Sequence, residues 1–501
     1  MLADALPPPS PSDSTMRILI SSDNHLVGGG RVGGRPRRWK RVESVPTPVP
    51  PPQGCWEKDD ARRNDSFDTF DEVFELATQN KARWGRGEKE GRRAAPRRRR
   101  RPPCFFPPSL PLQADFVLLG GDLFHDNRPS RSTVVRALST LYRHCLRGGG
   151  GGAGGGGGDD ARRLRPTTRL ALDAPTTGRP PADGIVGGAA NFGDPSVAVT
   201  LPVFTIHGNH DDPGGADNLS AVDMLAAARA VNYFGKVPLE GSEQGRLAIN
   251  PVIVSRRAAD GAPSPAPRVA LYGLGAHRED RVARVFRAAG AVTWEAPPAD
   301  TYNIFVIHQN REARGRASAG GHTLVDPRCL PPWLDLVVWG HEHECLGEVS
   351  VGGVPFAVLQ PGSTVATALS EGEAAPKHAY LLEIDAGAMA AASRRRAGVA
   401  ADSASPSPPS PRAAHHAFRV TSLPLDTARR FAYRTLSLKS KLAPGVDGEG
   451  AAVEAVLAAE VDAALADAAA RAPAGLGGRA PPEPPLVRLR VDYTGFTTLS
   501  R

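Results

Sequence analysis

The chain has 501 residues, 41% of them apolar, which is enough for two or three domains and for a substantial buried core. Its net charge of +8 comes from one segment, because residues 81–101 carry eleven Lys or Arg and two Glu, a net of +9. The rest of the chain sums to about −1, so the overall basicity does not identify a nucleic-acid-binding surface on the folded part.

Cysteine usage and the N-terminal sequence bear on the compartment. The five cysteines are odd in number and form no CxxC pair, which argues against a disulfide framework and favours a reduced intracellular compartment. The start MLADALPPPSPSDSTM lacks the basic residues and hydrophobic core of a signal peptide. No apolar run approaches the ~20 residues needed to span a bilayer. We therefore expect a soluble protein that is not secreted and not bound to a membrane.

Five short apolar runs predict strands that are buried on both faces. Each is rich in Val, Ile, Leu or Phe and ends in polar residues that can bind a metal. In chain order they are RILISSDNH (17–25), DFVLLGGD (115–122), PVFTIHGNHD (202–211), NIFVIHQNR (303–311) and LDLVVWGHEHE (334–344).

Helical patterns lie between these strands, at 65–80, 130–146 and 215–231. In the first of them, phenylalanines recur at helical spacing, and Asp65 or Ser66 can cap its start. Strands that alternate with helices indicate an α/β domain.

Composition divides the chain further. An N-terminal stretch (1–15) and three insertions (28–54, 82–113 and 148–184) are rich in Gly, Pro or Arg, and they hold too few apolar residues to offset the entropy of ordering them, so we expect disorder. A Ser/Pro-rich linker at 391–416 separates a first domain, 16–390, from a second region, 417–501.

The first two insertions share an unusual ending. Each ends in Gln, at Gln53 and Gln113, after a run of Pro or Leu, as a translated intron end would. One hypothesis is that both are retained introns, and the alternative is that they are real insertions. A transcript that lacks both segments supports the first, and protease peptides from them in the native protein support the second.

Polar residues at the five strand ends form the candidate site, because side chains gather outside the carboxyl ends of strands in α/β sheets. A single histidine beside a strand is more often structural, but five successive strands that end in this way indicate metal binding. Without a thiolate, the mixture of carboxylate, imidazole and amide favours Mn²⁺, Fe²⁺ or Zn²⁺ over a structural cysteine–zinc site. The candidates are Asp23, His25, Asp122, Asn209, His210, His308, His341 and His343.

In order along the chain, these residues make the pattern DxH, GD, GNH, H and GHxH, which resembles the calcineurin-like metallophosphoesterases. The stretches RRNDSFDTFDEV, LLGGDLFHDNRPSR, IHGNHDDP, VVWGHEHEC and QPGSTVAT resemble, more narrowly, the nuclease of the eukaryotic double-strand-break repair complex, the meiotic recombination 11 family. Serine/threonine phosphatases of the same superfamily would show GDxVDRG and GNHE instead. The resemblance implies a four-layer αββα sandwich, with a partial, truncated DNA-capping domain at 417–501.

The resemblance also implies roles for the site residues, with two Mn²⁺ ions as cofactors. One ion would be held by Asp23, His25, Asp122 and His343, and the other by Asp122, Asn209, His308 and His341. His210 would orient the scissile phosphate and protonate the leaving oxygen, with His125 assisting it. From its position next to His210, we also expect Asp211 to hold the His210 imidazole in place.

The implied function is a manganese-dependent DNA exonuclease and endonuclease that acts in the nucleus at double-strand breaks, during repair and meiotic recombination. The implied partners are DNA ends, a second copy of the chain, a coiled-coil ATPase of the SMC type and a checkpoint adaptor. Dimer contacts are expected at Val134, Leu138, Leu141 and Leu225, unless these residues pack on their own sheet. The alternatives are another dinuclear metallophosphoesterase, or a repair scaffold made inactive by the insertions and the truncation.

Overall fold

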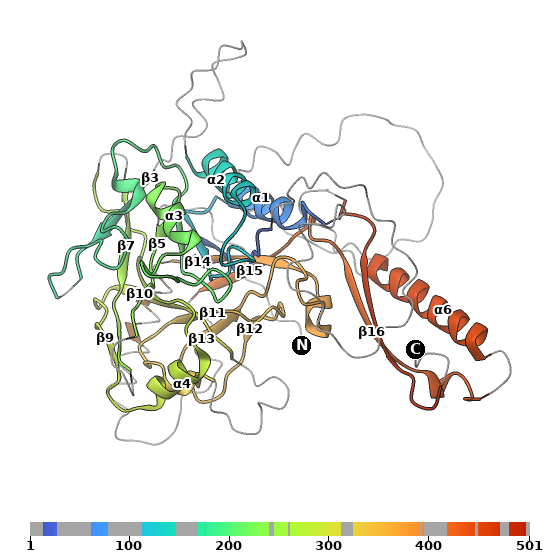
Figure 1. Cartoon of the computed structure of the whole chain (residues 1–501). Helices are drawn as coiled ribbons and strands as arrows, with labels where there is room; N and C mark the ends of the chain where they lie inside the picture. The colour runs from blue at the N-terminus through green and yellow to red at the C-terminus, as the bar shows by residue number, and fades with distance from the viewer. Residues whose placement is uncertain are drawn as a thin grey trace, which may run out of the picture.

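The computed structural model describes the protein over most of the predicted elements (Figure 1). The described residues are 14–27, 62–78, 113–146, 168–175, 177–239, 245–258, 261–311, 324–385, 387, 389–390, 393–394, 418–445, 449–470 and 480–496. Outside these residues lie the predicted insertion at 28–54, nearly all of the insertion at 82–113 and of the N-terminal stretch 1–15, and most of the linker at 391–416.

A six-stranded sheet carries three of the five predicted strands. Strands β1, β2, β4 and β5 are parallel, while β14 is antiparallel to β1 and β15 is antiparallel to β14. The carboxyl ends of β1, β2 and β4 therefore meet at one edge. In sheet order the strands are β15 (Arg419–Pro424), β14 (His378–Ile384), β1 (Met16–Ser21), β2 (Phe116–Leu119), β4 (Val203–Thr205) and β5 (Asn232–Tyr233).

A seven-stranded sheet carries the other two predicted strands, β10 and β11, side by side and parallel. Strands β8 and β13 flank them in the same direction, whereas β12, β7 and β3 are antiparallel to their neighbours. In sheet order the strands are β12 (Gly347–Val349), β13 (Ala357–Gln360), β11 (Leu336–Gly340), β10 (Thr301–His308), β8 (Arg268–Leu274), β7 (Val252–Ala258) and β3 (Thr168–Asp173). Two short strands, β6 (Leu247–Ile249) and β9 (Val292–Trp294), pair separately.

The two sheets pack face to face with helices on both outer faces. The helices are α1 (Asp65–Thr78), α2 (Arg131–Cys145), α3 (Ala221–Ala227), α4 (Glu279–Arg287) and α6 (Glu449–Ala470), with short 3-10 turns η4 (Asn191–Gly193), η6 (Pro327–Cys329), η7 (Glu371–Ala374) and η10 (Leu438–Ser440). Along β10, Ile304 faces the core between the sheets, whereas Phe305 faces the core under α4. Along β1, Leu19 faces the core under α1, α2 and α3. This confirms the predicted αββα sandwich.

The sequence pattern explains the outer helices. Helix α1 buries the phenylalanines that recur at helical spacing, Phe67, Phe70 and Phe74. Helix α2 begins after Ser130, whose hydroxyl accepts the Thr133 N–H at 3.2 Å. The third predicted helix, at 215–231, is shorter than expected, because α3 covers only Ala221–Ala227. Among the helices that the structure describes, none has the length and apolar composition that crossing a membrane requires.

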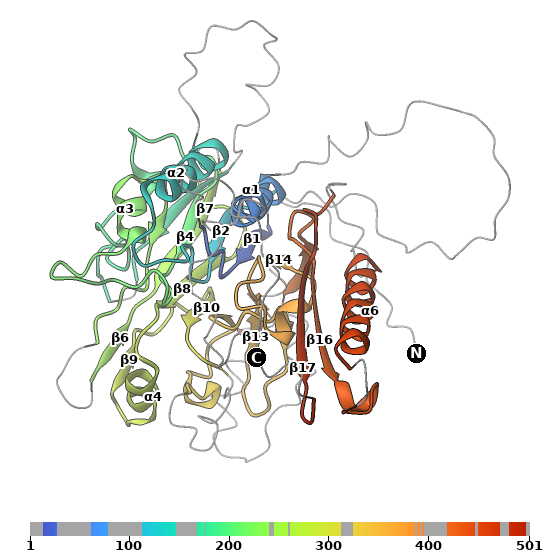
Figure 2. The ribbon, with the colours of Figure 1, turned by 45° about the vertical axis from the view of Figure 1, so that its right-hand side comes forward.

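The C-terminal unit, defined here as β16 (Phe431–Ser437), η10, α6 and β17 (Leu486–Asp492), lies beside the sandwich. Strands β16 and β17 pair in parallel, and α6 packs on one face of the pair. Both views place this two-stranded ribbon between the sandwich and α6 (Figures 1 and 2). Its second face is therefore turned toward the sandwich.

One predicted boundary is wrong, and a second boundary is crossed by strand pairing. The third insertion was expected to be disordered over 148–184, but β3, at 168–173, pairs with β7 at the edge of the second sheet. The second region was expected to begin at 417, and its first strand, β15, pairs with β14 and so extends the first sheet across that position. In both cases the strand is stabilised by a partner that is distant in sequence, and local composition carries no signal of that partner.

A buried ion pair joins α1 to the chain between β15 and β16. Asp65, expected as a helix cap, instead accepts two hydrogen bonds from the Arg429 guanidinium, at 2.6 and 2.9 Å. The two side chains are only 5% and 6% exposed. Nearby, the Glu72 carboxylate accepts the backbone N–H groups of Asp426 and Thr427, both at 2.8 Å. These contacts fix the segment that leads into the C-terminal unit.

Replacing Arg429 with methionine is expected to lower the free energy of unfolding by about 3–5 kcal/mol, because it leaves the Asp65 carboxylate buried without its partner. Urea unfolding followed by circular dichroism measures the change. The matched control is Arg430→Gln, which breaks an ion pair with Glu483, a side chain 60% exposed, and should cost less than about 1 kcal/mol. Equal effects for the two variants would contradict the assignment.

Candidate metal centre

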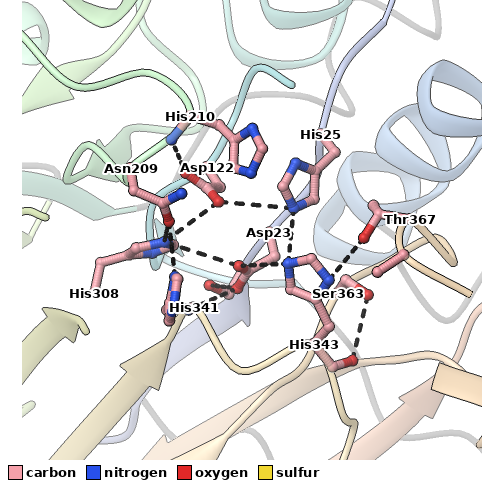
Figure 3. Close-up of polar contacts among 12 residues, drawn as sticks. Asp23, His25, Asp122, Asn209, His210, His308, His341, His343, Ser363 and Thr367 are labelled. Carbon is pink, nitrogen blue, oxygen red and sulfur yellow. Dashed lines mark hydrogen bonds and ion pairs between the residues drawn. The ribbon is translucent and has the colours of Figure 1, made fainter. Parts of the chain in front are cut away.

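The predicted site residues converge where the carboxyl ends of the strands from both sheets meet (Figure 3). Asp23 and His25 follow β1, Asp122 follows β2, Asn209 and His210 follow β4, His308 ends β10, and His341 and His343 follow β11. Ligand atoms of Asp23, His25, Asp122 and His343 all lie within 4.8 Å of one another. The same holds for Asp122, His308 and His341, so Asp122 belongs to both groups.

The backbone turns sharply at several of these positions. Asp23, His25, Asp122 and His341 have positive φ angles of 51°, 47°, 48° and 79°, which cost energy for residues with a Cβ. Close approach of the loops also requires glycine, since a Cβ on Gly208 would lie 2.0 Å from Asp122 Oδ1. Strain of this kind persists where the surrounding structure enforces it, which is typical of functional sites.

In the first group, two imidazoles and two carboxylates face one another. His25 Nε2 lies 3.2 Å from His343 Nε2 and 3.7 Å from Asp122 Oδ2. His343 Nε2 lies 3.8 Å from Asp23 Oδ1. Asp23 Oδ1 and Asp122 Oδ2 are fully buried, yet neither accepts a hydrogen bond from any described residue. Buried anionic oxygens in this state are expected where a cation compensates the charge.

The second group has similar contacts around Asn209. His308 Nε2 lies 3.4 Å from Asp122 Oδ2 and 3.3 Å from Asn209 Oδ1, and His341 Nδ1 lies 2.7 Å from the same amide oxygen. The second group thus brings together one carboxylate, one neutral amide oxygen and two ring nitrogens, at hydrogen-bonding distance or slightly beyond it. This is a donor set that borderline divalent cations accept.

Outer hydrogen bonds select the imidazole tautomers. His308 Nδ1 donates to the Gly120 carbonyl at 2.8 Å, and a carbonyl can only accept. His343 Nδ1 lies 3.0 Å from Glu373 Oε1 and 2.7 Å from Thr367 Oγ1. Both rings therefore carry a proton on Nδ1, which leaves Nε2 as the nitrogen that faces the site.

Charge at the site follows from burial and the carboxylates. Burial lowers the pKa of His341 to about 3 and that of His25 well below its usual range, so both rings are neutral at physiological pH. Burial acts on His308 in the same direction, but the carboxylates of Asp122 and Asp23 outweigh it and raise the pKa of His308 to about 10. The two carboxylates therefore favour a positive charge between the groups.

His210 and His125 form a third group above the first. The His210 ring stacks on His125 with ring centres 5.1 Å apart, and His210 Nδ1 donates to the His125 carbonyl at 2.7 Å. His125 Nδ1 lies 3.4 Å from His25 Nδ1. Both rings are only half-buried, unlike His25. His210 is thus held by one ring nitrogen at the rim of the site.

The expectation that Asp211 holds the His210 ring is wrong. Asp211 is fully buried, and its carboxylate accepts three backbone N–H groups, from Leu123 at 2.8 Å, Phe124 at 3.1 Å and Gly208 at 2.6 Å. Because those residues flank Asp122 and Asn209, Asp211 ties together the two loops that carry them. The carbonyl of His125 orients the His210 ring instead.

Several supporting residues were missed from the sequence. Glu373 and Thr367 contact His343, the hydroxyl of Ser22 donates to Asp23 Oδ2 at 2.5 Å, and Lys377 Nζ donates to the His343 carbonyl at 3.2 Å. Glu373 lies 30 residues beyond His343, so no local spacing could have linked them.

Comparison with known proteins agrees with this geometry. Residues 176–345 match the family model of the calcineurin-like phosphoesterases, and residues 418–500 match the Mre11 DNA-binding presumed domain. The double-strand break repair proteins MRE11 of Oryza sativa, Arabidopsis thaliana and Homo sapiens are 34%, 32% and 30% identical to this chain. These matches cover 97–98% of this chain and 51–52% of each relative, so the chain spans about half the length of the curated relatives it matches. The chain thus carries a calcineurin-like phosphoesterase domain and an Mre11 DNA-binding presumed domain, and over nearly its whole length it is similar to MRE11 proteins.

Proposed function

We propose that this chain hydrolyses phosphodiester bonds of DNA, as a manganese-dependent exonuclease and endonuclease that acts in the nucleus at double-strand breaks, during repair and meiotic recombination. The observation that carries the proposal is the pair of buried carboxylate oxygens, Asp23 Oδ1 and Asp122 Oδ2, which accept no hydrogen bond from the described residues and are surrounded by ring nitrogens. The matched family models and the names of the relatives support the choice of DNA as substrate.

The donor atoms fit two divalent cations. One would be held by Asp23, His25, Asp122 and His343, and the other by Asp122, Asn209, His308 and His341. The mixture of oxygen and imidazole ligands, without thiolate, suits Mn²⁺. Two such cations would polarise the phosphodiester and lower the pKa of a bound water.

The protein's own part in the reaction centres on His210. Its Nδ1–H is held by the His125 carbonyl, so Nε2 is the atom that would exchange a proton with the leaving oxygen of the DNA. Its backbone N–H donates to Asp122 Oδ1 at 2.8 Å, which fixes the loop relative to the shared carboxylate. His125, stacked on His210, would assist by keeping the ring plane constant.

Dimerisation is also proposed, with contacts that differ from those expected. Leu141 and Leu225 are fully buried in the core under their own sheet, and Leu138 packs against the same core, so the prediction that they face a partner is wrong. Val135, Tyr142 and Met224 are instead 60%, 45% and 50% exposed on α2 and α3. Exposed apolar side chains on adjacent helices fit an interface between two copies. Assembly with an ATPase and an adaptor stays a prediction from the family resemblance.

Cleavage of end-labelled duplex DNA tests the proposed function. The chain should cut the duplex in the presence of Mn²⁺, and removal of the metal by a chelator should stop cleavage, because the ring nitrogens and carboxylates then have no cation to hold. Hydrolysis of small phosphodiesters without DNA cleavage would instead identify another kind of metallophosphoesterase. Two bound cations with no hydrolysis of either substrate would favour a scaffold.

A further inference from the structure

The C-terminal unit contacts the loop that orients one of the site histidines. Strand β16 packs against η7, which carries Glu373. From the adjacent strand, Arg488 Nη1 donates to the carbonyls of Ala368 and Leu369, both at 3.1 Å. Strand alternation explains this direction, since Val487 and Leu489 pack toward α6 and Arg488 lies on the opposite face.

The turn that Arg488 contacts is strained and is folded around a single carboxylate. Leu369 has a φ angle of 52°, which is unfavourable for a residue with a branched side chain. Glu373 Oε1 accepts the N–H of Thr367 at 2.9 Å and that of Ala368 at 3.3 Å, and Oε2 accepts the N–H of Ser370 at 2.9 Å. The guanidinium of Arg488 satisfies the carbonyls on the outer side of the same turn.

The carboxylate of Glu373 acts directly on His343. Glu373 is 1% exposed, and its Oε1 accepts a hydrogen bond from His343 Nδ1 at 3.0 Å. The hydroxyl of Thr367 bridges the two groups, 2.7 Å from His343 Nδ1 and 2.9 Å from Glu373 Oε1. Any shift of the turn therefore changes the direction in which His343 Nε2 points.

In the second ligand group, which contains His308, a different part of the chain orients the histidine. His308 is oriented by the Gly120 carbonyl, which belongs to the loop after β2. Between the start of β16 and η7, by contrast, a cavity of about 50 Å³ is lined by Glu373, Pro376, Arg430 and Phe431 among others. The junction between the C-terminal unit and η7 is therefore incompletely packed there, and the two hydrogen bonds of Arg488 link the unit directly to the turn.

We propose that Arg488 is a positioning residue for the metal centre. By holding the turn at 367–370, it fixes Glu373 and Thr367 against His343, so the cation held by His343 binds tightly only while the C-terminal unit is seated on the sandwich. The inference rests on the proposed function only in requiring that cations bind at this centre, and it does not depend on the substrate. Loss of the contact should weaken one cation and leave the cation near His308 unchanged.

Titration of Mn²⁺ into the full chain, followed by calorimetry, tests this inference. Outer partners of metal ligands change affinity by about 10–100-fold, and Arg488 lies one contact further out, so Arg488→Gln should weaken one of the two cations by about 5-fold. Arg488→Lys should restore part of the affinity, since its ammonium can reach a carbonyl. The matched control is Arg490→Gln, two residues along the same face of β17 and likewise exposed, for which the described residues give no hydrogen bond. Arg490→Gln should leave both affinities unchanged.

Two further readouts separate positioning from general damage. Amide hydrogen exchange over 367–374 should accelerate in Arg488→Gln and not in Arg490→Gln, with the melting temperature unchanged in both. In a background that carries both Glu373→Ala and Thr367→Val, Arg488→Gln should have no additional effect, because Arg488 acts on His343 through these two side chains.

The outcomes also separate this inference from the proposed function. Unchanged affinity for both cations in Arg488→Gln, or equal weakening of both, would overturn the inference while leaving DNA cleavage by the wild type unaffected. A wild-type chain that binds two cations but does not cut DNA would overturn the proposed function, and the affinities would still decide the role of Arg488. A wild-type chain that binds no cation would overturn both.

Discussion

Replacing His210 with glutamine is expected to reduce the rate of DNA cleavage by about 10²–10⁴-fold while leaving both cations bound, since this is the usual contribution of a general acid. His210 is held at Nδ1 by the His125 carbonyl, and its side chain belongs to neither cation group in the proposed assignment. Glutamine keeps hydrogen-bonding capacity but cannot give up a proton at neutral pH. The measurement is single-turnover cleavage of end-labelled duplex DNA, together with Mn²⁺ titration of the same preparation.

A second histidine provides the control for this prediction. His144 lies on α2, where it pairs with Asp71 at 3.0 Å. His144→Gln should cleave DNA at the wild-type rate. If His210→Gln also cleaved at that rate, proton transfer would have to be assigned to another group. If it lost the cations as well as the activity, His210 would be a ligand, as its proximity to His25 and His125 allows.

Replacing Asp122 with asparagine is expected to weaken both cations together, by at least ~100-fold each, because its charged oxygen is shared by both ligand groups. Asparagine preserves the shape of the side chain and the acceptor for the His210 N–H, so the loop should stay in place. A loss of Mn²⁺ affinity would then result from the missing negative charge of the Asp122 carboxylate. Mn²⁺ titration measures it, and cleavage should be lost in parallel.

The control for Asp122 lies in the neighbouring loop. Asp212 is not fully buried, accepts a hydrogen bond from the Asn127 side chain and belongs to neither ligand group. Asp212→Asn should therefore bind two cations with wild-type affinity. Weakening of only one cation in Asp122→Asn would show that the carboxylate is not shared, which would contradict the proposed ligand assignment.

Much of the site could be predicted because its residues directly follow the strands that position them. Each of the five predicted runs is a strand in the structure, and the residues just beyond them, such as Asp122 after β2 and His308 at the end of β10, do converge. Local sequence carries this information, since a buried apolar run followed by Gly, Asp or His specifies both the strand and its polar end.

The features of the fold and of the site that the sequence did not predict depend on contacts between distant segments. The partner of Asp211 could not be inferred, because the adjacent ring of His210 is the obvious candidate and the actual donors lie on other parts of the loops. Strand β3 lies in a segment whose composition predicts disorder, and β7 supplies the hydrogen bonds that stabilise it. Likewise, the orientation of His343 depends on Glu373 and, through the turn, on Arg488. These pairings follow from the tertiary structure.

The most direct test of the central claim is anomalous scattering at the manganese edge from crystals of this chain grown with Mn²⁺. The account predicts two peaks on opposite sides of Asp122 Oδ2, one next to His25 and His343 and the other next to Asn209 and His308. A single peak, or peaks away from Asp122, would contradict a two-cation centre built from these residues.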